Sequence, residues 1–473
     1  MLSVKKTEIK WKSVTVEDMP RLRKYYKNCD YRLCEYSAGI KLMWRGVLHP
    51  AWAEVAGCLV VRNGTAGEYM FDYPVAGKDG SVEQALETVE RYCIDRGITP
   101  VYSVVPQEKL PVLLGRYPHV VVKRPISWSD YLYRAEDMMT FAGRRYSGQR
   151  NHINKFKKNY PTASFCPLTA EDKERLEQFW QDYEEVFAKG GDEKARRELE
   201  LAKKMFRYVG KPWFCAGGME HEGRLISVCL AERCGETMIV HIEKALYGYE
   251  GIYPTMVNAF AQYYGGGIAV FNREDDARDK GLRTSKLQYL PMERAGKNCL
   301  ELRNELWGLK EIPSFASARL TITALREEDR AAYNALCLDD ARNCLWGYDY
   351  REDLEGELTE DYFLSVARED FKNRQAVNFA LRLDGKFIGE AVLYHFDYKG
   401  GAELGCRIAA EYEGFGYGRE AFAAVADWAL YSLGVSEVVA KCSKENEASY
   451  KMLSSCMRPN GEDNTFFYFK KIV

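Results

Sequence analysis

The sequence predicts a mixed α+β protein built from three tandem units, each with a central mixed β-sheet flanked by helices. Its 473 residues exceed the ordinary size of one domain. A short motif recurs about every 155 residues, which is itself a typical domain length. In the last third of the chain, strand-like runs at 377–382 and 388–394 alternate with a helical stretch at 419–433. This alternation favours helices packed in layers on sheets.

The repeated motif is a strand end followed by a helix start. Residues 14–22 closely resemble residues 168–176, and residues 325–333 form a weaker third copy. In the first two copies a threonine can cap the helix, and an aspartate follows at the capping-box position. Arg326 replaces the threonine in the third copy, so we expect that cap to be lost. Helix starts of this kind are common, so coincidence remains an alternative to a repeated fold.

The connecting segments divide the chain into domains at residues 1–130, 131–310 and 318–473. Residues 125–130 combine a proline with two serines and are expected to bridge the first two units. Residues 309–318 have a similar composition and are expected to link the second unit to the third.

Composition argues against several classes of protein. The chain is 46% hydrophobic, and its 67 Lys and Arg residues nearly balance 69 Asp and Glu residues, so no overall field favours nucleic acid or membrane. No apolar run approaches the roughly 20 residues of a membrane span, and the charged N-terminus does not resemble a signal peptide. Fourteen cysteines are scattered without a CxxC pair, and the six histidines form no HExxH. We therefore expect a cytoplasmic protein with free thiols and no metal site.

A glycine-rich segment near the C-terminus has the strongest chemical signature. The expected strand 402–409 runs into a loop with Gly414, Gly416 and Gly418, and then into a helix with an apolar face. Alternate glycines permit close backbone approach, and the N–H groups of the loop and helix start can hold a pyrophosphate. A tight turn without a ligand is the alternative. The segment fits neither a dinucleotide-binding fingerprint nor a P-loop.

Downstream, residues 437–442 read as a strand, and Asn446 and Ser449 open a helix. This order of strand, glycine loop, helix, strand and Asn-x-x-Ser resembles the GNAT acetyltransferase superfamily, in particular the ribosomal-protein N-terminal acetyltransferases, over residues 318–473. The resemblance implies acetyl-CoA as cofactor and N-acetylation of a primary amine on a small molecule or peptide. It places the acetyl-CoA pyrophosphate on the backbone of Phe415, Gly416, Tyr417, Gly418, Arg419 and Glu420, and Asn446 and Ser449 near the thioester. Three positions depart from the family pattern, namely Glu413, Leu453 and the pair at 457–458.

Acetyl transfer needs a base for the amine and contacts for the acceptor. Glu403, just before a possible bulge at Gly405, is the first candidate for the base, with an ordinary polar strand residue as the alternative. Trp346, Tyr348 and Asp349 follow the first helix, where this fold usually places acceptor contacts. They could hold a cationic amine by cation–π and charge pairing, or form a buried aromatic loop.

The N-terminal two thirds contain a basic stretch. Residues 141–158 include several Lys and Arg residues and no acid. The stretch could bind an anionic ligand such as phosphate, a lipid head group or tRNA, and a solvated basic helix is the alternative.

Two further polar clusters, at 241–245 and 272–286, follow the basic stretch. Together the three resemble the phosphatidylglycerol lysyltransferase C-terminal domain family over residues 10–305, a family found in many stand-alone bacterial proteins and built from two GNAT-like units. That family transfers an aminoacyl group from tRNA, so aminoacyl-tRNA-dependent transfer by the N-terminal pair and a non-catalytic ligand-sensing role are both alternatives to acetylation. The resemblance implies Arg150 and Asn154 on a ligand-facing helix, and a cleft between the units lined by Glu243, Lys244, Asn272, Glu274, Asp275, Arg283 and Lys286.

Overall fold

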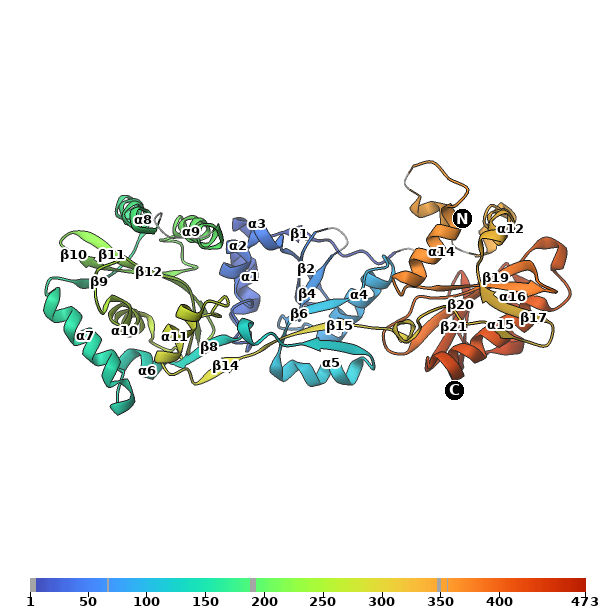
Figure 1. The fold of residues 1–473 in the computed structure, drawn as a ribbon. Coiled ribbons are helices and arrows are strands. Elements are labelled where there is room, and N and C mark those ends of the chain that lie inside the picture. The colour runs from blue at the N-terminus through green and yellow to red at the C-terminus, as the bar shows by residue number, and fades with distance from the viewer. Residues whose placement is uncertain (1–5, 66–67, 188–192, 347–349, 355) are drawn as a thin grey trace.

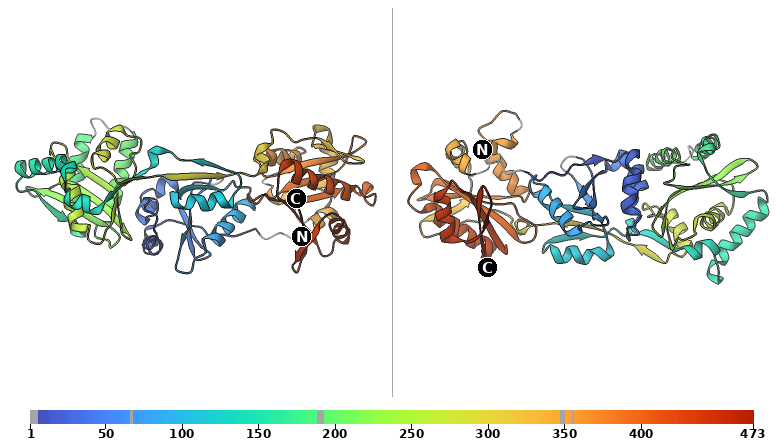
Figure 2. Two further views of the ribbon diagram at one scale, coloured as in Figure 1. Left: turned by 90° about the horizontal axis from the view of Figure 1, so that it is seen from below. Right: turned by 180° about the vertical axis from the view of Figure 1, so that it is seen from behind.

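The computed structural model describes residues 6–473 apart from 66–67, 188–192, 347–349 and 355. Three mixed sheets form three units, which lie in a row (Figure 1). The first unit occupies the middle of the row, with the second and third units at opposite ends, and the other views agree (Figure 2). This confirms the predicted α+β class and the three-unit architecture.

The first unit has the strand order β1-β2-β3-β4-β6-β15-β7, with β5 paired to β3. Its last strand but one, β15, comes from residues that the sequence boundaries assign to the second unit. The chain therefore returns to the first sheet before entering the third unit, and the second unit ends earlier than residue 310. The elements are β1 (Lys12–Ser13), α1 (Met19–Tyr26), α2 (Ala38–Met43), α3 (Arg45–Leu48), β2 (Ala51–Val55), β3 (Cys58–Asn63), β4 (Met70–Asp72), β5 (Val75–Ala76), α4 (Val82–Ile94), β6 (Val101–Pro106), α5 (Leu110–Arg116), β7 (Val120–Lys123) and β15 (Lys297–Leu302).

The second unit has the strand order β14-β8-β13-β12-β11-β10-β9. It shares a hydrophobic core with the first unit, in which Leu22 and Val60 of the first belong to the same cluster as Phe179 and Leu230 of the second. The two units are therefore a fused pair. The elements are β8 (Asp130–Arg134), α6 (Ala135–Thr140), α7 (Ser147–Asn159), β9 (Ser164–Pro167), α8 (Lys173–Phe187), α9 (Glu193–Phe206), β10 (Cys215–His221), β11 (Arg224–Cys234), β12 (Thr237–Ala245), α10 (Ile252–Tyr264), β13 (Val270–Asn272), α11 (Lys280–Gln288) and β14 (Glu293–Ala295).

The third unit has the strand order β16-β17-β18-β19-β20-β21-β23-β22 and a core of its own. It begins slightly earlier than predicted, because β16 lies within the expected linker and pairs with β17. The elements are β16 (Phe315–Ala316), β17 (Leu320–Ala324), α12 (Arg330–Cys337), α13 (Asp340–Trp346), α14 (Tyr362–Lys372), β18 (Val377–Leu383), β19 (Lys386–Tyr394), β20 (Gly401–Ile408), α15 (Tyr417–Trp428), β21 (Glu437–Ser443), α16 (Glu447–Cys456), β22 (Arg458–Glu462) and β23 (Phe466–Ile472).

The repeated motif starts a main helix in each unit, namely α1 in the first, α8 in the second and α12 in the third. In every copy the aspartate accepts a hydrogen bond from the backbone N–H three residues earlier, at 2.9 Å for Asp18, 2.7 Å for Asp172 and 2.8 Å for Asp329. The aspartate half of the cap thus persists in the third copy despite Arg326, and there the buried Asp329 also pairs with Arg382. Each sheet also contains a parallel pair among the described strands, β4 with β6, β12 with β13 and β20 with β21. The repeat is therefore structural rather than coincidental.

Candidate functional site

Two strands of the third sheet separate beside the glycine loop. β20 and β21 pair in parallel only from Gly401–Glu403 to Glu437–Val439. Beyond Glu403, β20 continues its ladder with β19 as far as Ile408, while β21 continues with β23 as far as Ser443. The two strands therefore separate beyond Glu403 and Val439, which leaves a gap in the hydrogen-bonded ladder of the sheet.

The glycine loop at the start of α15 is open. Gly414 and Gly416 have φ values of +81° and +82°, a region that strains any residue with a Cβ. A Cβ built on Gly414 would meet nothing within 4 Å, and one on Gly416 would meet only Arg319, at 3.5 Å. The first N–H groups of a helix lack intrahelical acceptors, so the amides of Tyr417, Gly418 and Arg419 are suited to a pyrophosphate.

Glu420 does not share this role, which corrects one expected cofactor contact. Its N–H donates to the Gly416 carbonyl at 3.2 Å, so it is already used inside the helix. Its carboxylate accepts hydrogen bonds from Ser317 and from Arg319, and Arg319 also lies over the Tyr417 ring. Glu420 thus fastens the start of α15 to the turn between β16 and β17. Phe415 contributes an exposed ring, and its carbonyl accepts from Arg319.

The corresponding loops of the other two units are closed. In the first unit, the amides of Gly77 and Ser81 donate to the carbonyls of Gly57 and Ala56, at 2.9 Å each. In the second unit, a Cβ on Gly251 at the start of α10 would collide with a carbonyl of α7, which covers the loop. Within the described part of the chain, the glycine loop of the third unit thus differs from its two counterparts, which are packed against backbone.

Asn446 and Ser449 lie at the start of α16, after β21. The Asn446 side chain accepts from the Ser449 N–H at 3.0 Å and so caps the helix. This bond uses its oxygen and leaves its amide N–H groups for a ligand. Leu453, which stands where the family pattern has a tyrosine, is buried in the core.

Glu403 lies at the point where β20 and β21 separate, bound to three side chains. Tyr394 donates to one carboxylate oxygen at 2.8 Å, Lys441 pairs with it at 3.0 Å, and His395 Nδ1 lies 3.1 Å from the other oxygen. Burial alone would raise the pKa of Glu403, but the bond from His395 and the charge of Lys441 lower it to about 2. The expected bulge at Gly405 is absent, since β20 keeps a regular register with β19 there. So acidic a carboxyl is a weak proton acceptor.

A cavity of about 490 Å³ lies next to this cluster, on the side of the sheet away from α15. Successive side chains of β20 point to opposite faces of the sheet, which shows on which face the cavity lies. Leu404 packs in the core with α15, whereas Glu403 and Arg407 point to the opposite face. Tyr394, His395 and Lys441 line the cavity. Of the predicted acceptor residues, Tyr348 and Asp349 lie outside the described residues, and the side chain of Trp346 is likewise not described.

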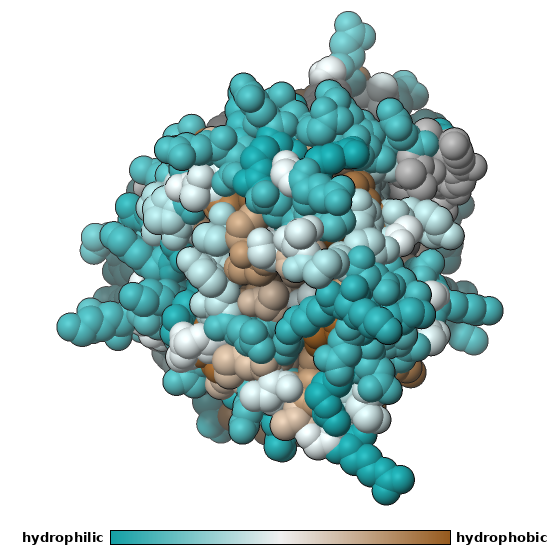
Figure 3. Space-filling model, turned by 90° about the vertical axis from the view of Figure 1, so that its left-hand side faces the viewer, coloured by the Kyte–Doolittle hydropathy of each residue, from teal (hydrophilic) through white to brown (hydrophobic). Residues whose placement is uncertain are grey.

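The predicted basic helix is α7, at the outer end of the second unit. That end of the molecule is largely hydrophilic with a narrow hydrophobic strip (Figure 3). Asn154 is exposed there, whereas the Arg150 guanidinium is bound to the carbonyls of Phe141 and Gly143. Arg144, Lys157 and Lys158 are exposed.

Glu243 and Lys244 do not line one cleft, because adjacent residues of β12 point to opposite faces of the sheet. Glu243 binds Arg273 at 3.0 Å, while Lys244 pairs with Glu198 of α9 at 2.9 Å. Arg283 is also set apart, since it forms a bidentate pair with Asp276.

Asn272, Glu274 and Asp275 meet the first unit. The Asn272 amide donates to the Arg32 carbonyl at 2.6 Å and to Asp130 at 2.8 Å. Glu274 binds the buried His241 at 2.9 Å. Burial lowers the pKa of His241, but its bonds to Glu232 and Glu274 raise it to about 9. The Lys286 ammonium donates to the carbonyls of three consecutive residues, 273–275, and so supports this loop rather than lining the site.

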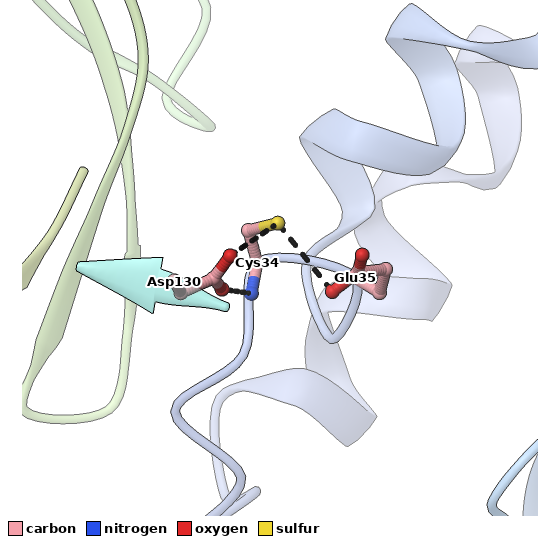
Figure 4. A group of neighbouring side chains, drawn as sticks. All are labelled: Cys34, Glu35 and Asp130. Carbon is pink, nitrogen blue, oxygen red and sulfur yellow. Dashed lines mark hydrogen bonds between the residues drawn. The ribbon is translucent and has the colours of Figure 1, made fainter. Parts of the chain in front are cut away.

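The centre of this junction is a buried cluster that sequence reasoning missed. Cys34, Glu35 and Asp130 converge from the two units (Figure 4), with ligand atoms close enough to share a cation. Lys297 of β15 supplies that cation: its Nζ lies 2.7 Å from Glu35, 2.7 Å from Asp130 and 3.3 Å from the Cys34 sulfur. No local pattern marks Lys297, because its position depends on the return of the chain to the first sheet.

Comparison with known proteins agrees with this arrangement. A family model described as phosphatidylglycerol lysyltransferase, C-terminal, matches residues 27–299, more than half of the chain, and a GNAT acetyltransferase domain model matches residues 319–456. A conserved protein of unknown function from Bacteroides thetaiotaomicron is 24% identical, with a TM-score of 0.56 over 63% of this chain and 100% of that one. L-PGS from Bacillus licheniformis is 11% identical, with a TM-score of 0.46 over 61% of this chain and 92% of that one.

An uncharacterized protein of Mycoplasmoides gallisepticum is 25% identical over 171 residues, which are 35% of this chain and 53% of that protein. This chain thus spans about half the length of that curated relative. Among the described residues, every helix is too short or too polar to cross a membrane. The chain belongs to the phosphatidylglycerol lysyltransferase C-terminal family, and it carries an additional domain that matches the GNAT acetyltransferase model.

Proposed function

We propose that the third unit transfers the acetyl group of acetyl-CoA to a primary amine. The observation that carries this proposal is the open glycine loop beside the separated ends of β20 and β21, when the other two loops are closed. The amides of Tyr417, Gly418 and Arg419 hold the pyrophosphate, and the pantetheine arm lies between the strands. Bound acetyl-CoA supplies an activated thioester.

His395 is the base in this proposal, and Glu403 positions it. An ionised carboxylate only accepts hydrogen bonds, so His395 Nδ1 must carry the proton that binds Glu403. The neutral ring then has a lone pair on Nε2, and His395 lines the cavity. This repeats the logic of a histidine oriented by a buried carboxylate.

The chemical step is direct attack. The amine nitrogen forms a bond to the acetyl carbon, the thioester C–S bond breaks, and the sulfur leaves as the thiolate of CoA. His395 Nε2 accepts the proton that the amine loses. No covalent enzyme intermediate is required, and Cys406 is an unsuitable nucleophile because burial raises its thiol pKa to about 12.

His395→Gln tests this role, since glutamine can still donate to Glu403 but cannot accept a proton. Release of CoA thiol from acetyl-CoA in the presence of primary amines is expected to fall about 10²- to 10⁴-fold in kcat, with acetyl-CoA affinity unchanged by calorimetry. His119→Gln, at an exposed histidine of the first unit, is the matched control and should behave as the parent. An undiminished kcat in His395→Gln would remove histidine from the mechanism.

A second activity is proposed for the fused pair, namely aminoacyl transfer from tRNA. Family membership and the exposed Arg144, Lys157 and Lys158 around α7 support it. Filter binding of aminoacyl-tRNA should weaken steeply with salt, and reversing these three charges should flatten that dependence. Binding that is absent, or insensitive to the substitutions, would end this proposal.

A further inference from the structure

The cavity beside His395 is built by two units. The end of α4 and the turn after it contribute residues 94–98 of the first unit, and α14, β19, β21 and the segments 374–376 and 395–398 contribute much of the wall from the third unit. Part of the first unit, more than 300 residues away in sequence from the glycine loop, thus faces the proposed reaction centre.

This wall is fixed rather than a loose contact between domains. Tyr398 of the third unit is buried in the core of the first, and Leu306 from the connecting segment is buried in the core of the third. Lys399 pairs with Glu90 at 3.1 Å across the same boundary. The Gln375 amide donates to the Gly97 carbonyl, where any side chain on Gly97 would collide with it.

The cavity is lined by two groups of residues, one suited to bind an amine and the other suited to bind an anion. His395 and Tyr394, both bound to Glu403, mark the amine end. Two other lining residues, Arg96 and Arg374, carry guanidinium groups, and neither forms an ion pair in the described part of the chain. Arg96 donates to the carbonyls of Thr7 and Tyr92, and Arg374 lies over the Phe371 ring.

Two residues at the same wall have a buried polar atom with no hydrogen-bond partner among the described residues. These atoms are Nη1 of Arg374 and Oδ1 of the neighbouring Asn304, which is 4% exposed. The two residues are joined, because the Asn304 amide donates to the Arg374 carbonyl at 2.7 Å. An unpaired donor and an unpaired acceptor are costly unless a ligand satisfies them. Among the other charged lining residues, Asp95 pairs with Arg91 and Lys441 with Glu403, and Lys6 and Asp370 complete the set.

We infer that this cavity is the acceptor site, and that the acceptor is a primary amine that also carries a carboxylate, of the size of an amino acid or dipeptide. The inference rests on the proposed acetyl transfer and deepens it. The amine points to His395, and the carboxylate binds Arg374 and Arg96, the geometry for which guanidinium groups are best suited. None of the glycine-loop residues lines the cavity, so the anion bound here is not the pyrophosphate.

The test compares each amino acid with the amine left by its decarboxylation, using the full chain and acetyl-CoA. Lysine against 1,5-diaminopentane and tyrosine against tyramine are suitable pairs. We expect kcat/KM to favour the carboxylate-bearing member by about ten- to hundredfold, the effect of one charge-assisted contact. Arg374→Gln and, from the other unit, Arg96→Gln should each abolish most of that preference without changing acetyl-CoA affinity.

Arg368→Gln is the matched control, because this arginine lies on α14, is half exposed, pairs with Glu327 and does not line the cavity. Equal rates for both members of each pair, or an Arg374→Gln variant that behaves like Arg368→Gln, would overturn the inference while acetyl transfer itself stands. Failure of the parent to bind acetyl-CoA would instead refute the proposed function. The two failures are therefore distinguishable.

Discussion

Lys297→Met is expected to destabilise the fused pair strongly. The ammonium is 1% exposed and neutralises Glu35 and Asp130, of which Asp130 is fully buried. Its removal leaves these carboxylates without a counter-charge in the junction between the two units. Because breaking a buried ion pair on one side leaves an uncompensated charge, the expected loss is about 3–5 kcal/mol.

The loss should depend on pH in a definite direction. Burial already raises the folded-state pKa of Glu35 above its ordinary value, and the charge of Lys297 opposes this rise, so removal of Lys297 raises that pKa further. A carboxyl group whose folded pKa is raised stabilises the fold below its unfolded pKa and loses that contribution as the pH rises. The deficit of the variant is therefore largest at pH 7 and shrinks towards pH 5. Lys297 itself, whose pKa lies well above its ordinary value in the parent, stays charged over this range.

Urea denaturation followed by circular dichroism at both pH values measures the effect. Lys123→Met is the matched control, because Lys123 lies on the neighbouring strand β7 and is mostly exposed, pairing loosely with Glu301 at 3.4 Å. It should unfold like the parent. A Lys297→Met variant as stable as this control would show that the buried cluster does not hold the two units together.

Three further outcomes follow from the third unit and its boundary. Tyr398→Ala should cost about 3 kcal/mol and expose the junction of the first and third units to limited proteolysis, whereas Ala at the exposed Tyr431 should not; equal cleavage would contradict the rigid boundary. Arg382→Met should lower the urea midpoint by leaving the buried Asp329 unpaired, and an unchanged midpoint would contradict that role. Because the pKa of Glu403 is lowered to about 2, its carboxylate stabilises the fold fully above about pH 4.3, and this contribution is lost only as the pH falls towards about 2. Thermal melts should therefore show Glu403→Gln less stable than the parent at pH 5. Equal stability of the two proteins at pH 5 would contradict this role.

Local patterns in the sequence were sufficient for the architecture. The aspartate of the repeated motif marks the start of one main helix in each unit because capping is a local interaction, and the glycine loop is likewise read from neighbouring residues. The return of β15 to the first sheet could not be read in this way, since strand pairing across some 190 residues leaves no local signature. The predicted boundary at residue 310 was wrong for that reason.

The site was predictable only in part. Glu403 was identified by its position on the strand, but its low pKa comes from His395 and Lys441, which arrive from other strands. Glu243 and Lys244 were assigned together because they are adjacent, although adjacency in a strand separates them onto opposite faces. Residues that act through tertiary contacts are thus the ones that sequence patterns missed.

One glycine loop of the three is open, and calorimetric titration of the full chain with acetyl-CoA is the sharpest test of this statement. Gly416 and Gly461 both have positive φ, and Gly461 lies on β22 with free space around it, so Gly461→Ala is the matched control for Gly416→Ala. We expect one acetyl-CoA per chain for the parent and for Gly461→Ala, and binding at least tenfold weaker for Gly416→Ala. Two or three sites per chain, no binding by the parent, or equal affinity in both variants would contradict this expectation.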